Sequence, residues 1–376
     1  MHQNLKPSPL LESKKAQLHF HQPAQTSRNT LTHRNIWILH WRTLESECAP
    51  LPGLSSDWHS EKDWENALAL ALQEFNASMN GLSPHLSLEG WEPWLDQWRS
   101  NYPSIAFGLE NILQQIYNSA KIVYPDSINP STQPQFTPLQ TAAESSSLRI
   151  NGLVWMNDVE TMRREALHKI ALGFDCLKFK IGALDWQAEL DMIAGIRSLY
   201  PASVLEIRVD ANGALNPDRA AQQLTDLHQL EVHSIEQPLT PRLDHLLPDL
   251  AQANSLPIAL DESILLRQPH EASRQWLANS GTKYLVLKPS LLGGFKIAEA
   301  WIEIAENLGM GWWITSALES NIGLGTIASW TYHQVQRRNN TLAQGLGTGA
   351  LYTDNFPATT FIRGGRLHTL SHWIPL

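Results

Sequence analysis

The decisive stretch of this sequence runs from residue 177 to residue 288, where five short apolar runs each end in a charged residue. They are Leu177-Lys178-Phe179-Lys180, Ile207-Arg208-Val209-Asp210, Ser234-Ile235-Glu236, Ala259-Leu260-Asp261 and Val286-Leu287-Lys288. Their charged ends lie 25 to 30 residues apart, which suits one strand–helix unit each. Because parallel strands joined by helices point the same way, we expect the five ends to meet at one face of a sheet.

The surrounding sequence extends this pattern into a barrel. Apolar runs alternate with helical patterns such as Trp186–Leu199 and Pro217–His228. We expect strands near residues 152–156, 175–180, 204–210, 233–236, 258–261, 284–288, 311–315 and 343–345. Eight such units predict an α/β fold, a (β/α) barrel with its chemistry at the C-terminal ends of the strands.

The first part of the chain follows a different pattern. Strand-like stretches at Ala16–His21 and Asn35–Trp41 precede helical patterns, which indicates an α+β unit. The helical patterns are Glu61–Asn76, Pro93–Asn101 and Ala106–Ala120.

A Pro-, Ser-, Thr- and Gln-rich segment, residues 126–146, is typical of a linker between the two parts. The tail Thr360–Thr369 predicts one more strand, which we expect to fold back onto the N-terminal unit. We therefore expect a capping domain of residues 1–148, completed by residues 355–376, and a barrel of residues 149–354.

Composition narrows the function. The 376 residues are enough for two domains, and the formal charge of −9 argues against nucleic-acid binding. We find neither a run of about 18 apolar residues nor the apolar core of a secretion signal, so we expect a cytoplasmic protein without membrane contact. The spacing of Cys48 and Cys176 suits no zinc site and favours two free buried thiols over a disulfide.

The order of charges at the strand ends is one cation, three anions and one cation: Lys180, Asp210, Glu236, Asp261 and Lys288. A lone Asp after a strand usually caps the next helix, but neighbouring carboxylates repel one another unless a cation lies among them. An all-oxygen set suits Mg²⁺, and the missing His or Cys ligands disfavour zinc. The flanking lysines face each other, and we expect a dication and burial to lower a lysine pKa enough for proton abstraction next to a carboxylate.

At these residues the sequence resembles the muconate-lactonising-enzyme subgroup of the enolase superfamily, whose lysine-plus-magnesium chemistry is well known. Within that subgroup the Glu47–Ser55 and Pro103–Glu110 segments are similar to the capping loop and cap helix of o-succinylbenzoate synthases. The resemblance implies an enolase-type, modified TIM barrel with a split α+β capping domain. The barrel motifs that carry it are Lys178-Phe179-Lys180, Val209-Asp210-Ala211-Asn212-Gly213, Ile235-Glu236-Gln237-Pro238, Leu260-Asp261-Glu262-Ser263 and Leu287-Lys288-Pro289-Ser290.

The resemblance also implies roles for individual residues. Asp210, Glu236 and Asp261 would bind Mg²⁺, with Mn²⁺ as an alternative. Lys180 would remove the proton next to the substrate carboxylate and then assist the loss of hydroxide as water. Lys288 would stabilise the enediolate by its charge.

Further residues are expected to support the site or the substrate. Lys178 would assist Lys180 or contact the carboxylate, although it lies one layer deeper on the same strand face. Arg208 and Asn212 would support the site, and Arg208 could orient a carboxylate. Three more candidates follow the last strands. Ser316 and Glu319 would either contact the substrate or cap a helix. Gly347 lies in a turn that would either let backbone N–H groups approach a substrate carboxylate or be a plain tight turn.

The expected reaction is a syn-dehydration of 2-succinyl-6-hydroxy-2,4-cyclohexadiene-1-carboxylate to o-succinylbenzoate in menaquinone biosynthesis, with a small-molecule carboxylate as the partner. An N-acylamino acid racemase or dipeptide epimerase is the alternative enzyme, using Lys180 and Lys288 as opposed bases. Dipeptide epimerases carry Asp-x-Asp after the eighth strand, where this chain has Gly347-Thr348-Gly349. A barrel without catalysis that serves as a binding protein is the non-enzyme alternative.

Overall fold

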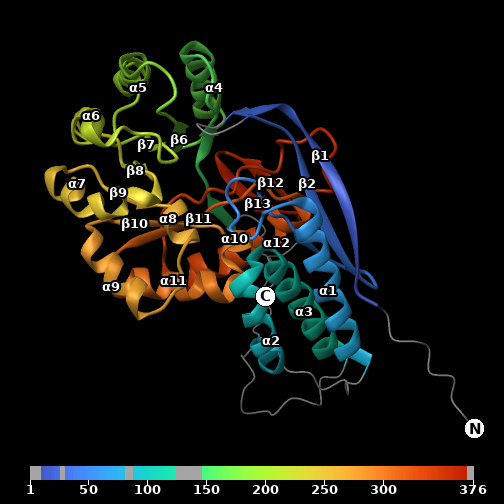
Figure 1. Ribbon diagram of the computed structural model, residues 1–376. Coiled ribbons are helices and arrows are strands. Elements are labelled where there is room, and N and C mark those ends of the chain that lie inside the picture. Colours follow the sequence, from blue (N-terminus) through green and yellow to red (C-terminus); the bar gives the residue numbers. More distant parts are fainter. Residues whose placement is uncertain (1–9, 26–29, 81–87, 124–145, 371–376) are drawn as a thin grey trace, which may run out of the picture.

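The computed structural model describes residues 10–25, 30–80, 88–123 and 146–370, which form a capping part beside a barrel (Figure 1). The predicted linker lies almost wholly outside these residues. Within them no helix is long and apolar enough to cross a membrane. Cys48 and Cys176 are both free and buried, as predicted.

The capping part is an antiparallel sheet packed on three helices, which confirms the α+β prediction. Its strands, in spatial order, are β1 (Glu12–Gln25), β2 (Thr30–Trp41) and β3 (Leu44–Cys48). Its helices are α1 (Glu61–Asn80), α2 (Leu88–Asn101) and α3 (Pro103–Val123). Tryptophans fill the space between the layers, and the rings of Trp37 and Trp64 lie 4.5 Å apart.

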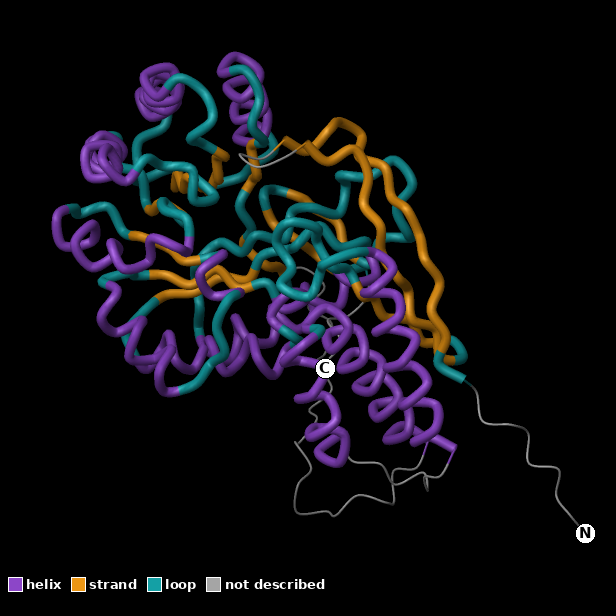
Figure 2. Tube along the Cα trace, viewed as in Figure 1, coloured by secondary structure: helices purple, strands orange, loops and turns teal. Residues whose placement is uncertain are grey.

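The barrel contains seven parallel strands in which each strand pairs with the next along the chain. They are β5 (Gly152–Val154), β6 (Cys176–Lys180), β7 (Glu206–Asp210), β8 (Ser234–Glu236), β9 (Ile258–Leu260), β10 (Tyr284–Leu287) and β11 (Gly311–Ile314). Figure 2 shows these strands in the interior with helices around them. The first seven predicted strands are therefore confirmed, with their ends shifted by up to two residues.

Helices connect the strands on the outside of the barrel. The longer ones are α4 (Val159–Ala171), α5 (Trp186–Leu199), α6 (Pro217–Gln229), α7 (Leu247–Ala253), α9 (Glu271–Ser280), α11 (Phe295–Asn307) and α12 (Asn321–Arg338). Short turns η3 (Pro241–Leu246), α8 (Glu262–Leu265) and α10 (Pro289–Leu292) follow three strands directly. Side-chain caps start several helices where the sequence offers Asp, Asn or Ser, for example Asp185 on α5 and Ser320 on α12.

The predicted eighth strand is present only as two single parallel bridges. Gln344 bridges Ile150 on one side, and Gly345 bridges Thr315 on the other. The Gln344 N–H donates to the Arg149 carbonyl over 2.8 Å, and the Gly345 N–H donates to the Ile314 carbonyl over 2.7 Å. These bonds complete the ring between β11 and β5, so the barrel closes without a full-length strand.

The tail is a hairpin rather than the single strand that we predicted. Strands β12 (Thr360–Arg363) and β13 (Arg366–Thr369) are joined by Gly364 and Gly365, which both take the positive φ that the tight turn requires. Strand β13 pairs with β4 (Ser147–Arg149), next to the barrel. The contact with the capping sheet comes earlier, where Tyr352 bridges Phe20. The domain division given above stays a proposal.

Two glutamates of the capping part, the buried Glu47 and the partly buried Glu110, bind the N-terminal ends of barrel helices. The Glu47 carboxylate accepts the Ser320 and Gly323 N–H groups at the start of α12, each over 3.0 Å. The Glu110 carboxylate accepts the Phe295 and Lys296 N–H groups of α11 over 2.8 and 3.1 Å. Helix N-terminal N–H groups lack intrahelical partners and carry partial positive charge, so these contacts join the two parts favourably.

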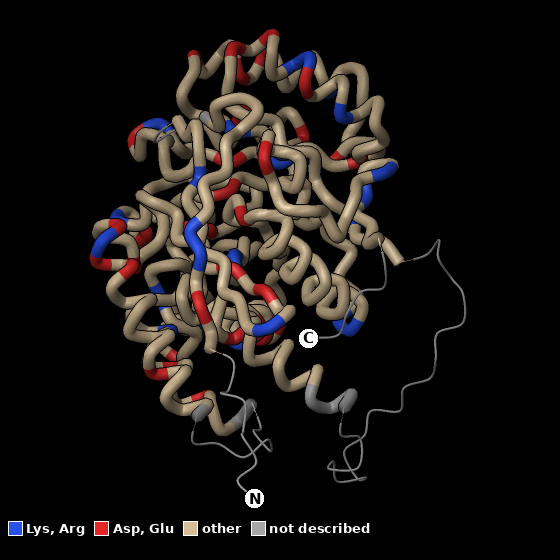
Figure 3. Tube along the Cα trace, turned by 90° about the vertical axis from the view of Figure 1, so that its right-hand side faces the viewer, with Lys and Arg blue, Asp and Glu red and all other residues tan. Residues whose placement is uncertain are grey.

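Charged residues of both signs are interspersed along the chain. In the face that Figure 3 presents, Lys and Arg positions lie among Asp and Glu positions rather than in a block of one sign.

Candidate active site

Three buried carboxylates lie at the C-terminal ends of neighbouring barrel strands. Asp210 ends β7, Glu236 ends β8 and Asp261 directly follows β9. Asp210 and Glu236 face each other as pairing partners in the sheet. None of the three is more than 2% exposed. The structure therefore brings together the three residues that the sequence predicted as metal ligands.

Three lysines surround these carboxylates. The Lys178 Nζ lies 3.0 Å from the Asp210 Oδ2 and 2.9 Å from the Glu236 Oε2. The Lys180 Nζ lies 2.6 Å from the Asp210 Oδ2. The Lys288 Nζ donates to the Asp261 Oδ2. Each anion is thus paired with a cation, as buried charges require.

The electrostatics of the cluster are set by its crowding. Burial, together with Asp210 and Asp261, raises the pKa of Glu236 to about 8. Burial also acts to raise the pKa of Asp210, but Lys180 and Lys178 outweigh it and hold that pKa well below its usual range. The cluster therefore favours added positive charge.

The expected lowering of a lysine pKa is not found at Lys178 or Lys288. Burial acts in that direction, but the neighbouring carboxylates outweigh it and raise the pKa of both amines. A dication among the carboxylates would reduce this attraction.

The donor set fits a hard cation. The Asp261 Oδ1 is buried and has no hydrogen-bond partner among the residues that the structure describes. Carboxylate oxygens are the ligands that Mg²⁺ prefers. Within the described ranges, no three acidic, His or Cys side chains form a ready-made metal site. The three carboxylates are instead held in ion pairs with the lysines. Asp210, Glu236 and Asp261 would have to exchange lysine contacts for metal contacts.

The charged cluster forms one side of a pocket of about 100 Å³. Leu51 and Leu54 of the capping part line it, as do Leu153 and Trp155 of the β5 side. Arg34, which is 2% exposed, holds the capping loop. Its Nη2 donates to the Ala49 carbonyl over 2.7 Å and to the Ala317 carbonyl over 3.3 Å. One buried cation thus ties the capping loop to the barrel.

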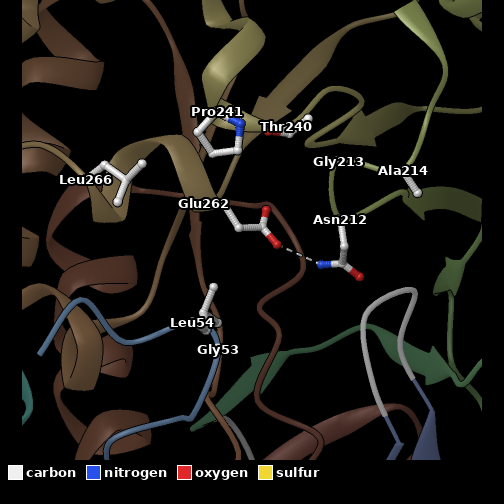
Figure 4. Close-up of a pocket in the computed structure, with 9 residues that line it drawn as sticks. All are labelled: Gly53, Leu54, Asn212, Gly213, Ala214, Thr240, Pro241, Glu262 and Leu266. Atoms are coloured by element: carbon white, nitrogen blue, oxygen red, sulfur yellow. Dashed lines mark hydrogen bonds between the residues drawn. The ribbon is translucent and has the colours of Figure 1, made fainter. Parts of the chain in front are cut away.

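A second hollow of about 470 Å³ adjoins the pocket and shares Leu54 and Asn212 with it (Figure 4). The Asn212 Oδ1 accepts from the Lys180 Nζ over 2.8 Å, and its Nδ2 donates to Glu262 over 3.0 Å. These bonds place Asn212 between Lys180 and Glu262, and Glu262 lines the neighbouring hollow.

Arg208 does not lie where the sequence suggested. Its Nε donates to Glu206 over 2.6 Å and its Nη1 to the Ala343 carbonyl over 2.9 Å, while its guanidinium lies 4.1 Å from the Trp313 ring centre. It does share the interior strand face with Asp210. It lies deeper in the barrel because it precedes the end of β7 by two residues, and there it pairs with Glu206.

The candidates after the last two strands divide between pocket and interior. Ser316 and Gly347 line the pocket. Glu319 is fully buried, and its carboxylate accepts the Ser316 hydroxyl over 2.6 Å and the Ala317 N–H over 2.9 Å, in addition to the Ser290 hydroxyl. These bonds hold the Glu319 carboxylate within its own loop, and the residue that caps α12 is its neighbour Ser320.

Three polar residues that line the pocket were missed from the sequence: Asn151, Thr315 and Thr348. The Thr315 hydroxyl donates to the Gly345 carbonyl over 3.1 Å. The only signal for Asn151 was one amide in the apolar run Ile150-Asn151-Gly152-Leu153-Val154, and Thr348 was passed over between two glycines.

Comparison with known proteins agrees with this geometry. The family described as Enolase C-terminal domain-like matches residues 161–371. The chain is 37% identical to the o-succinylbenzoate synthase of Desulfotalea psychrophila over 95% of this chain and 98% of that protein. A crystal structure of MenC from the same organism superposes with a TM-score of 0.74 at 33% identity, covering 96% of this chain and 100% of that one.

A substrate-bound L-Ala-D/L-Glu epimerase from Bacillus subtilis superposes equally well, with a TM-score of 0.75 over 96% of each chain. At 20% identity, this likeness concerns the fold alone. The family match and the Desulfotalea relative establish family membership in addition to the fold. The chain therefore belongs to the Enolase C-terminal domain-like family, and within it to the family of the o-succinylbenzoate synthases.

Proposed function

We propose that this protein catalyses the magnesium-dependent syn-dehydration of 2-succinyl-6-hydroxy-2,4-cyclohexadiene-1-carboxylate to o-succinylbenzoate. The observation that carries the proposal is the likeness to the Desulfotalea synthase over nearly the full length of both chains. The paired lysines and carboxylates at the barrel mouth support it. We further propose a cytoplasmic role in menaquinone biosynthesis, as the family resemblance implies.

The reaction needs one acid/base group that acts twice on the same face of the substrate ring. In our proposal, Lys180 takes the proton from the ring carbon that carries the carboxylate, and that C–H electron pair moves toward the carboxylate. The C–O bond at the neighbouring carbon then breaks, and Lys180 returns the proton to the leaving hydroxide, which departs as water. A syn elimination suits a single acid/base residue, because both groups leave from one side.

Lys288 has a different task in this proposal. It lies after β10, while Lys180 ends β6, so the strands with the three carboxylates separate them in the ring. Its amine is held by Asp261. A fixed ammonium there would stabilise negative charge that develops on the substrate when the proton leaves.

Asp210, Glu236 and Asp261 are the residues that would hold Mg²⁺. The ion would supply positive charge beside the substrate carboxylate. The raised pKa of Glu236 and the Asp261 Oδ1 without a partner support this assignment.

The direct test is an assay of the dehydration by the absorbance of the aromatic product. We expect turnover with Mg²⁺, loss of turnover with EDTA, and recovery when Mg²⁺ is restored. Absence of turnover at any metal concentration would contradict the proposal.

Hydrogen exchange separates the synthase from the alternative racemase or epimerase. In D₂O, an enzyme with two opposed bases would introduce deuterium into both enantiomers of an N-acylamino acid. We expect no such exchange at a rate comparable to dehydration. Rapid exchange without dehydration would favour the alternative.

A further inference from the structure

The pocket wall opposite the three carboxylates holds two polar side chains that the reaction has not yet used. Asn151 is 3% exposed and Thr348 is 5% exposed, and both line the pocket. Within the described ranges, neither the Asn151 Oδ1 nor the Thr348 Oγ1 has a hydrogen-bond partner. Buried polar atoms are nearly always satisfied in native proteins, so two such atoms in one pocket point to a ligand.

These two residues are neighbours across the closing edge of the barrel. The Asn151 N–H donates to the Gln344 carbonyl over 2.9 Å. A Cβ on Gly347 would lie 3.4 Å from the Asn151 carbonyl oxygen, so the backbone that carries Thr348 passes close to Asn151. The two side chains thus belong to one region of the wall.

The order of the strands places this region relative to the chemistry. The carboxylates follow β7, β8 and β9, and the two lysines of the proposed reaction follow β6 and β10. The rest of the ring is β11, the closing segment and β5. Ser316 follows β11, Thr348 follows the closing segment, and Asn151 directly precedes β5. A substrate whose carboxylate faces the acidic strands, with its reacting carbon between the lysines, therefore extends its other end toward this wall.

We propose that Asn151 and Thr348 bind the acyl side chain of the substrate. The Thr348 hydroxyl donates a hydrogen bond to one of the chain's oxygen atoms, and Asn151, whose unpartnered Oδ1 is itself an acceptor, presents its Nδ2 in place of Oδ1 by a half-turn of the amide. This inference rests on the proposed function, which supplies a substrate with a four-carbon keto-acid chain. An amide N–H and a hydroxyl are both neutral donors and suit either the ketone or the terminal carboxylate. The apolar residues Leu153 and Trp155 beside them suit the methylene carbons.

The test compares three ligands that differ only in this chain. Benzoate lacks it, 2-butyrylbenzoate has the ketone, and o-succinylbenzoate has both ketone and terminal carboxylate. Calorimetry with Mg²⁺ would measure their affinities for the wild-type protein, Thr348→Val, Asn151→Leu and the control Thr348→Ser. We expect each apolar variant to lose about tenfold or more in affinity for o-succinylbenzoate while binding benzoate within about twofold of wild type.

The same measurements distinguish the ways in which the idea could be wrong. A loss for 2-butyrylbenzoate as well would identify the ketone as the acceptor, and a loss for o-succinylbenzoate alone would identify the terminal carboxylate. Equal affinities in wild type and Thr348→Val, which differ by one atom, would overturn the inference, as would an equal loss for benzoate. If the wild-type protein dehydrates its substrate normally in that case, the proposed function still holds.

Stability provides a second readout. Because the two atoms lack partners in the described structure, Thr348→Val should not lower the melting temperature. A marked fall together with unchanged ligand affinity would assign Thr348 a purely structural role.

Discussion

The buried carboxylates at the barrel mouth and the carboxylates at the junction with the capping part are neutralised in different ways. At the mouth, Asp210, Glu236 and Asp261 lie together and are paired with lysine side chains. At the junction, Glu47 and Glu110 lie apart, and each accepts backbone N–H groups from a helix N-terminus. Glu110 has an additional ion pair, because the Arg99 Nη2 lies 3.3 Å from its Oε1.

This difference separates function from architecture. A lysine side chain can move and exchange its partner, so the mouth can accept a substrate or a cation. The N–H groups of a helix end are fixed in the backbone and cannot turn elsewhere. Changes at the mouth should therefore affect the rate most, and changes at the junction should affect stability most.

The largest expected effect is at the mouth. Lys180→Ala should lower kcat by about 10³-fold or more, because it removes the proposed acid and base. The melting temperature should stay close to wild type. Lys169→Ala is the matched control, since Lys169 is a half-buried lysine of α4 paired with Glu165, away from the pocket. A rate within tenfold of wild type would refute the role of Lys180.

At the junction, Glu47→Ala should mainly reduce stability. It leaves two buried N–H groups of α12 and the Ser320 hydroxyl without their acceptor, so we expect the free energy of unfolding to fall by about 2 to 4 kcal/mol. Urea unfolding measures this. The exposed neighbour Glu45, changed to Ala, should stay within about 0.5 kcal/mol of wild type. Equal effects of the two substitutions would remove the contrast between mouth and junction.

The junction should also respond to pH. Burial raises the pKa of Glu47 from 4.5 to about 7. The folded protein therefore holds a proton that the unfolded chain releases, and this contribution to stability is full below pH 4.5 and decreases as the pH rises through 7. The measurement is the unfolding free energy of wild type minus that of Glu47→Gln, at pH 5 and at pH 8. We expect this difference to favour wild type more at pH 5 than at pH 8, by no more than about 3 kcal/mol. A difference independent of pH would contradict the assignment.

The smallest effect concerns a glycine at the other helix end. Gly294, with a φ of 118°, lies so close to Glu110 that an added Cβ would be 1.6 Å from its Oε2. Gly294→Ala should lower the unfolding free energy by about 1 to 3 kcal/mol. Gly195→Ala, where nothing lies within 4 Å of the added atom in α5, should instead raise it by about 0.5 to 1 kcal/mol. If both substitutions changed the unfolding free energy in the same direction, the Glu110 contact would be weak.

The mouth could be predicted from the sequence and the junction could not. The strand-end charges recur at the interval of one barrel unit, so their meeting follows from the fold. Glu47 and Glu110 are single acids in a strand and a helix, and their partners Ser320 and Phe295 lie far along the chain. No local sequence pattern predicts such a contact.

The depth of a side chain within the barrel was the other property that could not be predicted from the sequence. Alternation along a strand tells which face a residue occupies, but not which neighbour it chooses. This is why Arg208 was expected near the carboxylates and is found with Glu206. It is also why Glu319 was expected at the substrate or at a helix cap and is found bonded to Ser316. Asn151 was overlooked because a single amide in an apolar strand has no sequence signature of its own.

The incomplete eighth strand gives the barrel unequal resistance to opening. Gln344 and Gly345 join their neighbours through single bridges, whereas β6 and β7 share five paired positions. Backbone amides at such a seam should exchange with solvent deuterium through small local openings, at a lower free energy than those of the regular strands. Asn151 and Thr348 lie beside these single bridges. The part of the wall nearest the proposed acyl-chain site is therefore also the part that should open locally at the lowest free energy.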